Sequence, residues 1–294
     1  MARDVVYLDM SLRVHIVVFC LLLLPLGLGA KVSYNSFEEA LYDKEKVTSI
    51  KITYRNLKEL PDIFDQFPNL EEINFNNNDL KTLPPSLFRC VKLRSIKLAK
   101  NELEVLPEAI GELTNLRYLS LSYNKLVALP ESIGKLTKLE ELSVKNNLLE
   151  TVPSSIGNLR NLTKLSLTSN QLTSVPNELS RLSKVELLDL ADNLLVSLPS
   201  TIGNLKSLRF FYISRNRLNH IPESLGNCKY LQELDAVYSG AMRLPFSLAK
   251  IQKLELVYID ERTISFYPDP RNKFRQRILV VSAGTSYYRT SQSF

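Results

Sequence analysis

Residues 116–138 read LRYLSLSYNKLVALPESIGKLTK, and residues 139–161 read LEELSVKNNLLETVPSSIGNLRN. Both stretches carry apolar residues at the same positions, an asparagine at the ninth position and a proline at the fifteenth. The pattern recurs every 23 residues from 47 to 254 without an insertion or a deletion. A fixed period of this length indicates a repeat architecture. The repeats begin at Val47, Leu70, Leu93, Leu116, Leu139, Leu162, Val185, Leu208, Leu231 and Leu254.

Each repeat is predicted to form a strand, a turn, a short helix and a second turn. The L-x-x-L-x-L segment alternates apolar and polar residues over its last positions, which is typical of a short strand with one buried face. The asparagine that follows can donate and accept hydrogen bonds, so it can satisfy backbone groups at the bend. The proline suits the first turn of a short helix. A glycine such as Gly134 permits a close approach or a positive φ at the end of that helix.

A single repeat cannot bury its apolar face, so neighbouring repeats must stack with parallel strands about 4.8 Å apart. We therefore expect an α/β fold, a curved solenoid of about ten repeats over residues 47–261. The parallel sheet is expected on the concave side and the short helices on the convex side. Leu98, Leu121 and Leu167 belong to one apolar column, and we expect all three to be buried.

This pattern resembles the leucine-rich-repeat superfamily. The second half of the repeat, LPESIGKL at residues 129–136, is similar to the subclass found in Ras-scaffold proteins, plant disease-resistance proteins and bacterial repeat proteins. The resemblance covers about residues 47–260. It implies binding of proteins, peptides, lipids or glycans, and it does not choose among them because one fold serves many functions.

Residues 1–30 are predicted to be a secretory signal peptide. Residues 14–28 are almost wholly apolar, Arg13 precedes them and small residues follow. The apolar stretch is rather short for a membrane span, which needs roughly 20 residues. Met10 is an alternative start, because the nine residues before it carry two acids. An uncleaved anchor and an internal helix are the alternatives to export.

The segments at the two ends of the repeat domain do not follow the repeat pattern. Residues 31–46 are predicted to contain a capping helix, since Ser36 and Glu39 form a capping box. Residues 262–294 are predicted to be a basic tail or a cap. They carry six Lys or Arg against one acid, and therefore +5 of the chain's net charge of +6. Because the repeats are nearly neutral, we do not expect them to bind nucleic acid.

The sequence offers little for catalysis. Cys90 and Cys228 occupy the same repeat position six repeats apart, so about 29 Å should separate them. A disulfide needs Cα atoms within about 7 Å, so both are expected to replace buried leucines. Outside the leader, the sequence has no histidine other than His220 and no CxxC pair. No catalytic residue, metal site or cofactor is predicted, and the chain is not expected to be an enzyme.

Partner-binding residues are expected on the outward side of the sheet, where the side chains differ between repeats while the apolar positions of the repeat stay the same. Aromatic and charged side chains gathered on one surface are typical of binding hot spots. The alternative is that tyrosine and phenylalanine simply favour strands and the charges solvate the face. The main predicted patch contains Asp189, Asp192, Phe210, Tyr212, Arg215, Asp235, Tyr238, Tyr258 and Asp260. A secondary patch contains Lys97, Lys100, Tyr118, Tyr123 and Lys145.

Three functional hypotheses follow. The first is an exported, monomeric repeat protein, secreted, periplasmic or on the cell surface, that binds a protein or peptide. The second is an intracellular signalling scaffold of the Ras-group type, and the third is a glycan or cell-envelope binder. Contact with a membrane is expected only through an uncleaved leader.

Overall fold

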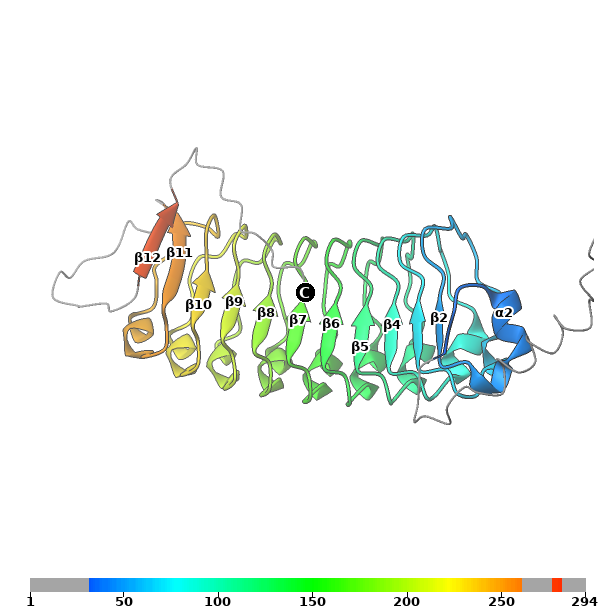
Figure 1. Cartoon of the computed structure of the whole chain (residues 1–294). Coiled ribbons are helices and arrows are strands. Elements are labelled where there is room, and N and C mark those ends of the chain that lie inside the picture. Colours follow the sequence, from blue (N-terminus) through cyan, green and yellow to red (C-terminus); the bar gives the residue numbers. More distant parts are fainter. Residues whose placement is uncertain (1–31, 261–276, 282–294) are drawn as a thin grey trace, which may run out of the picture. The chain divides into compact units, whose positions relative to one another are not determined.

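The computed structural model describes residues 32–260 and 277–281. The chain divides into two units after Val32, and the second, which begins at Ser33, contains the repeats. That unit contains one parallel sheet whose strands follow chain order (Figure 1). The strands are β1 (Ser33–Tyr34), β2 (Ser49–Lys51), β3 (Glu72–Asn74), β4 (Ser95–Lys97), β5 (Tyr118–Ser120), β6 (Glu141–Ser143), β7 (Lys164–Ser166), β8 (Leu187–Asp189), β9 (Phe210–Tyr212), β10 (Glu233–Asp235), β11 (Leu256–Asp260) and β12 (Arg277–Val281).

The register of the sheet equals the repeat length. Leu142 on β6 pairs with Leu165 on β7, and each strand from β2 to β10 pairs with the strand 23 residues on. The predicted α/β solenoid with a parallel sheet and short helices is therefore confirmed, and β2 to β11 supply its ten repeat strands. The sheet also has one strand beyond the repeats at each end, β1 and β12, which the repeat pattern did not predict.

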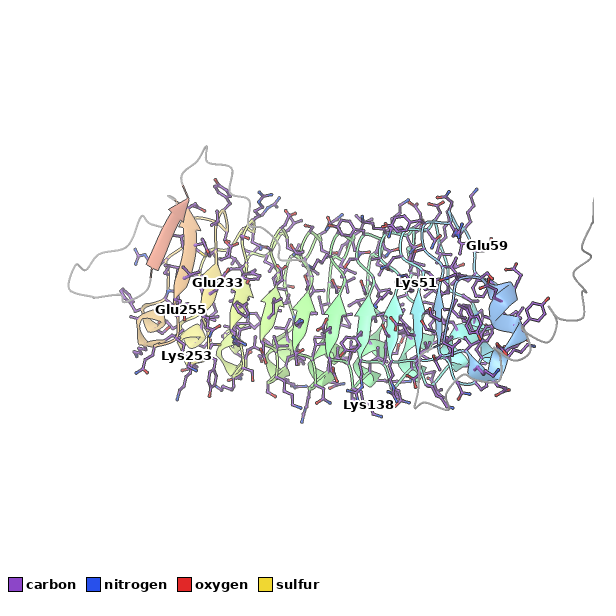
Figure 2. The ribbon with its side chains drawn as sticks, viewed as in Figure 1. Lys51, Glu59, Lys138, Glu233, Lys253 and Glu255 are labelled. Atoms are coloured by element: carbon purple, nitrogen blue, oxygen red, sulfur yellow. The ribbon has the colours of Figure 1, made fainter. Side chains whose placement is uncertain are left out.

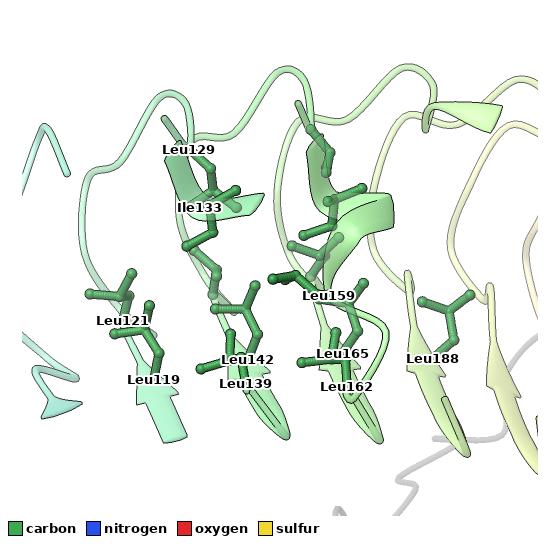
Figure 3. Close-up of a cluster of buried hydrophobic side chains, with 14 of the residues drawn as sticks. Leu119, Leu121, Leu129, Ile133, Leu139, Leu142, Leu159, Leu162, Leu165 and Leu188 are labelled. Atoms are coloured by element: carbon green, nitrogen blue, oxygen red, sulfur yellow. The ribbon is translucent and has the colours of Figure 1, made fainter. Parts of the chain in front are cut away.

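The interior is built from stacked apolar columns. Leu98, Leu121 and Leu167 are all fully buried, as expected from the sequence. Leu119, Leu142 and Leu165, one from each of three successive strands, lie side by side in this core (Figure 3). Full burial of one such side chain stabilises the folded chain by roughly 1.5–3 kcal/mol.

A ladder of buried asparagines joins the repeats behind the sheet. Asn147 shows the pattern: its Oδ1 accepts the Leu126 N–H at 3.0 Å. Its Nδ2 donates to the Leu121 carbonyl at 3.0 Å and to the Val144 carbonyl at 3.2 Å. Each amide therefore satisfies backbone groups of its own repeat and of the repeat before it. The ladder contains Asn78, Asn101, Asn124, Asn147, Asn170, Asn193 and Asn216.

The ladder ends at Ser239, which makes the equivalent hydrogen bonds through different atoms. Ser239 Oγ donates to the Ile213 carbonyl at 2.6 Å, as an asparagine amide would. The Ser239 backbone carbonyl accepts the Leu218 N–H at 2.6 Å, which replaces the missing side-chain oxygen. The next residue, Gly240, has φ +120° and lies so near that a Cβ would meet the Leu218 oxygen at 2.2 Å. The irregular ninth repeat thus keeps both hydrogen bonds, and only a glycine fits at the next position, Gly240.

The helices opposite the sheet are short 3-10 segments. Pro130 stands just before η5 in extended backbone and serves as its N-cap residue, so the proline precedes the helix and does not form its first turn. Gly134 is required by close approach, since a Cβ there would lie 2.6 Å from both Cβ and the carbonyl oxygen of Ser155 in the next repeat. The segments are η1 (Lys44–Lys46), η2 (Phe64–Gln66), η3 (Pro85–Arg89), η4 (Glu108–Glu112), η5 (Glu131–Lys135), η6 (Ser154–Asn158), η7 (Asn177–Arg181), η8 (Ile202–Asn204), η9 (Glu223–Asn227) and η10 (Phe246–Lys250).

The helix α2 (Phe37–Tyr42) lies at the N-terminal end of the repeats. The Ser36 hydroxyl accepts the Glu39 N–H at 3.2 Å and begins the helix. The Phe37 ring lies 5.8 Å from the Phe64 ring and 6.0 Å from the Phe75 ring, measured between centroids. Because Phe64 and Phe75 belong to the core of the first repeats, the helix covers apolar surface that the stack would otherwise leave open.

Cys90 and Cys228 are free and buried, as the repeat position predicts. The Cys90 thiol donates to the Phe64 carbonyl at 3.2 Å, and the Cys228 thiol to the Ile202 carbonyl at 3.7 Å. Burial raises the pKa of Cys90 to about 12 and that of Cys228 to about 11. Both therefore stay protonated at neutral pH and act as small apolar residues.

Within residues 32–260 and the strand at 277–281, no helix has the length and apolar character needed to cross a membrane.

Candidate functional site: the sheet face and its rim

The outward side of the sheet, here called the sheet face, carries the first and third residues of each repeat strand. On β6, for example, Glu141 and Ser143 are partly exposed while Leu142 between them is buried. Side chains project along this face from Lys51 on β2 to Glu233 on β10 (Figure 2). The frame is constant, and the residue types on it change from strand to strand.

A second column of variable side chains follows the strands, three residues after each one ends. In nine successive repeats this residue has φ between +50° and +59°, although none of them is a glycine. The backbone is held there by hydrogen bonds between repeats, such as Tyr123 N–H to the Lys145 carbonyl at 2.7 Å. We call this set the rim column. It contains Tyr54, Asn77, Lys100, Tyr123, Asn146, Ser169, Asp192, Arg215 and Tyr238.

The left-handed backbone costs free energy at each non-glycine position, of order 1 kcal/mol or more. The repeat can hold it because the adjoining ladder asparagine and the next repeat fix the bend. Sequence reasoning missed this feature, since six of the nine residues are of types that give no signal for positive φ. The signal available was position alone, because each rim residue from Asn77 onward directly precedes the ladder residue of its repeat.

The main predicted patch is only partly on the surface. Asp192, Arg215 and Tyr238 are exposed and are consecutive members of the rim column. Asp189, Phe210 and Tyr258 lie on the sheet face and are partly exposed.

Three predicted residues of that patch are buried, which corrects the expectation that they face solvent. Asp235 and Asp260 are each 2% exposed and Tyr212 is 6% exposed. Asp235 Oδ1 accepts the Val237 N–H at 3.2 Å, and the Asp260 carboxylate accepts the Tyr238 N–H. Tyr212 pairs in register with Asp189 and Asp235, and strands about 4.8 Å apart place a neighbour on each side of its ring. The two aspartates therefore hold backbone bends.

The partly exposed Asp189 has the same backbone role. Its Oδ1 accepts the Ala191 N–H at 3.1 Å, and its Oδ2 accepts the Ser166 hydroxyl at 3.4 Å. Asn74 makes the equivalent bond to the Asn76 N–H at 3.1 Å. An acid or amide at the last strand position thus fixes the turn two residues later, and its presence there does not by itself indicate a ligand.

The secondary patch is spread over both columns. Lys100 and Tyr123 are neighbours on the rim, with the Lys100 ammonium 5.9 Å from the centre of the Tyr123 ring. Lys97 on β4 is partly exposed and pairs with Glu72 at 2.8 Å. Lys145 is partly exposed just beyond β6.

Tyr118 is an exposed residue on β5. Its hydroxyl donates to the Glu140 carboxylate at 3.1 Å, which raises the pKa of Tyr118. Lys100 therefore contacts Tyr123, whereas Lys97 and Tyr118 each interact with a glutamate.

The sequence of the chain matches two family models. The model described as a leucine-rich repeat region matches residues 69–193, and the model described as a leucine rich repeat matches residues 207–228. The chain belongs to the leucine-rich-repeat family. No curated protein sequence matches it.

Solved structures of leucine-rich-repeat proteins share the fold. A leucine-rich-repeat protein of Leptospira interrogans is 32% identical with a TM-score of 0.73, over 77% of this chain and 58% of that protein. The ectodomain of the Arabidopsis thaliana receptor kinase GASSHO1/SCHENGEN3, in complex with CASPARIAN STRIP INTEGRITY FACTOR 2, is 30% identical with a TM-score of 0.67, over 74% of this chain and 27% of that one.

The Arabidopsis receptor kinase HAESA was solved in complex with the peptide hormone IDA and the co-receptor SERK1. It is 25% identical with a TM-score of 0.61, over 73% of this chain and 39% of that one. This chain therefore spans less than two thirds of each of these three proteins.

Proposed function

We propose that this leucine-rich-repeat protein is an exported, non-catalytic binding protein that takes a protein or peptide on its sheet face and rim column. The observation that carries the proposal is the arrangement of variable side chains on an invariant frame. A regular backbone presents two exposed columns, and their chemistry changes from repeat to repeat while the core does not. A surface of this kind suits an extended partner that contacts many repeats at once.

The rim residues Asp192, Arg215 and Tyr238 are the strongest candidates for the contact. They come from three successive repeats, so they lie in one row, and they offer an acid, a base and an aromatic ring. Tyrosine and arginine are enriched among the residues that dominate binding energy at interfaces. Each side chain is held on a fixed backbone bend, which reduces the conformational entropy lost on binding.

The solved relatives add support at the level of the fold. Two plant ectodomains with this fold were solved with partners bound, and one partner is a peptide hormone. A peptide or small protein is therefore the partner class that we favour for this chain over a glycan.

The test is a selection of peptides from a displayed random library against the purified full chain. Affinities of the selected peptides are then measured by fluorescence anisotropy. The double variant Arg215→Asn with Tyr238→Asn is expected to weaken binding by about tenfold or more, because two adjacent hot-spot candidates are lost. Asparagine tolerates a positive φ, so the rim backbone should be kept.

The matched control is Tyr230→Asn with Lys253→Asn. This pair also joins an exposed tyrosine to a cation, with the ammonium 4.7 Å from the ring centre, but Tyr230 lies ahead of β10 and away from the rim. Binding should be unchanged in the control. An equal loss in both double variants, or the recovery of no peptide, would contradict the proposal.

Export is a separate part of the proposal, because residues 1–30 lie outside the described residues. We expect the protein to be recovered outside the cytoplasm with Lys31 as its first residue. N-terminal sequencing of the recovered protein measures this. Recovery from the cytoplasm with residues 14–28 still present would reject export and favour the intracellular scaffold.

A further inference from the structure

A polar hollow lies on the flank of the repeats, beside the points where β4 and β5 begin. It has a volume of about 240 Å³ and spans several repeats. None of its lining residues belongs to the rim column. The lining residues are Glu71, Lys92, Arg94, Asn115, Arg117 and Lys138.

The hollow is strongly cationic. Four of its six lining residues carry a positive charge and only Glu71 carries a negative one. Arg94 and Arg117 directly precede the first residues of β4 and β5, and those residues are paired in register. The two guanidinium groups therefore start from backbone positions only about 4.8 Å apart. Like charges in this position repel each other, and a ligand of opposite charge would relieve that repulsion.

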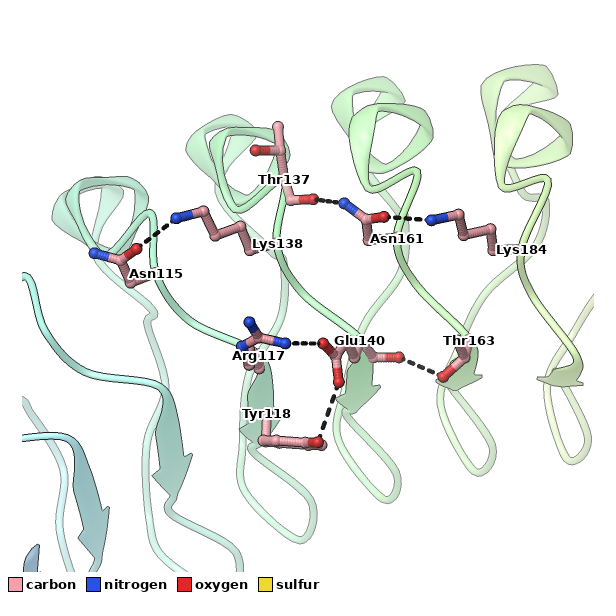
Figure 4. A network of polar contacts seen from close by, with 9 residues as sticks. All are labelled: Asn115, Arg117, Tyr118, Thr137, Lys138, Glu140, Asn161, Thr163 and Lys184. Carbon is pink, nitrogen blue, oxygen red and sulfur yellow. Dashed lines mark hydrogen bonds and ion pairs between the residues drawn. The ribbon is translucent and has the colours of Figure 1, made fainter. Parts of the chain in front are cut away.

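The carboxylates beside the two arginines do not saturate them. Within residues 32–260, Arg117 makes its side-chain bond through Nη1 alone, to Glu140 (Figure 4). The other oxygen of Glu140 accepts the Tyr118 hydroxyl, so this carboxylate has both oxygens engaged. Arg94 Nη1 lies 3.9 Å from the Glu71 carboxylate, which is too far for a hydrogen bond. The Arg94 side chain is 60% exposed, so its donors are accessible.

The two lysines are positioned by neutral groups. Lys92 Nζ donates to Asn69 Oδ1 at 2.7 Å, and Lys138 Nζ donates to Asn115 Oδ1 at 2.7 Å (Figure 4). Asn115 is itself fixed, since its Nδ2 donates to the Val91 carbonyl at 2.8 Å. An amide orients an ammonium without cancelling its charge, so both lysines add positive potential at the hollow.

We propose that this hollow binds a compact oxyanion, a phosphate or sulfate group, between Arg94 and Arg117. The inference goes beyond the proposed peptide binding, because it uses a different surface. Guanidinium groups present planar sets of donors that match tetrahedral oxyanions in a bidentate way. The lysines supply further charge at the edge. Free phosphate and a phosphate or sulfate ester on a larger ligand share this chemistry.

The experiment titrates the full-length protein with sodium phosphate and with sodium sulfate at constant ionic strength. Amide shifts are followed by nuclear magnetic resonance, with sodium acetate as the comparison anion. We expect saturable shifts near Arg94 and Arg117 with phosphate or sulfate, and none that saturate with acetate. The variant Arg94→Gln with Arg117→Gln should bind about tenfold more weakly, because both charged donors are lost.

The control Arg160→Gln with Arg217→Gln removes the same charge from two exposed arginines outside the hollow. It should bind like the parent protein. Absence of saturation, equal saturation by acetate, or equal weakening in the control would overturn the proposal. A thermal melt of both double variants separates loss of binding from loss of folding.

A second arm separates the sources of the anion. Glucose 6-phosphate and glucosamine 6-sulfate are titrated beside inorganic phosphate. Tighter binding of an ester would assign the hollow to a phosphorylated or sulfated ligand, and tighter binding of inorganic phosphate would assign it to the free ion. Both results support an oxyanion site.

Discussion

Replacing Asn147 by alanine is expected to lower the free energy of unfolding by about 2–6 kcal/mol, because a buried N–H left without a partner costs about 1–3 kcal/mol and each further hydrogen bond lost costs about 0.5–1.5 kcal/mol. The Leu126 N–H loses its partner. The Leu121 and Val144 carbonyls each lose one of two bonds, because the Nδ2 of a neighbouring ladder asparagine still donates to each of them. Asn147 is only 6% exposed, so water cannot replace the amide without opening the stack. Urea unfolding followed by circular dichroism measures the loss.

The control is Asn161→Ala, which removes an exposed side-chain amide whose nitrogen and oxygen both form hydrogen bonds. Asn161 Nδ2 donates to the Thr137 carbonyl at 2.8 Å, and its Oδ1 accepts from Lys184 at 2.7 Å. Water can take over both bonds, so the loss should be about 0–1 kcal/mol. Similar losses for the two variants would mean that burial does not control the contribution of the ladder.

The fold could be predicted because one pattern is repeated ten times. An apolar side chain such as Leu98 or Leu165 has the same position in every copy, and only stacking buries all the copies together. The ladder could be predicted for a related reason, since a polar amide recurring beside buried leucines needs a structural role. A single strand of three residues would have given no comparable signal.

The candidate site could be predicted only in part, because hydrogen bonds within the chain compete with solvent for polar side chains. Asp235 and Asp192 are both acids near the end of a strand, and the repeat pattern marks both as candidate binding residues. Asp235 turns to the backbone two residues on and is buried, whereas Asp192 stands on the rim and is exposed. That difference depends on the backbone angle of each position, which the residue type does not reveal.

The strands outside the repeats show a second limit. β1 covers only two residues, and its partner β2 lies 16 residues on instead of 23. It joins the sheet because the edge of β2 offers unpaired backbone groups, which any extended segment can satisfy. Side-chain periodicity carries no information about such pairing.

Replacing Leu121 by alanine is the second change for which we expect a large effect. Leu121 lies near the middle of the stack and is fully buried (Figure 3). The neighbouring strands and ladder bonds fix the spacing on both sides, so the cavity cannot collapse. A loss of about 2–5 kcal/mol in the free energy of unfolding is therefore expected, as for other buried leucines.

The same column shows where alanine is accepted. Ala236 occupies the equivalent position in the ninth repeat and is fully buried, in the repeat whose backbone has adjusted around Gly240. Because each repeat contacts only its neighbours, the damage from Leu121→Ala should concentrate around its own repeat. Hydrogen exchange should show the fastest opening at β4, β5 and β6. The control Val127→Ala changes an exposed side chain and should alter stability by less than about 0.5 kcal/mol. If Leu121→Ala were as mild as the control, or if exchange rose evenly from β2 to β11, the stack could not be the locally coupled array that its register implies.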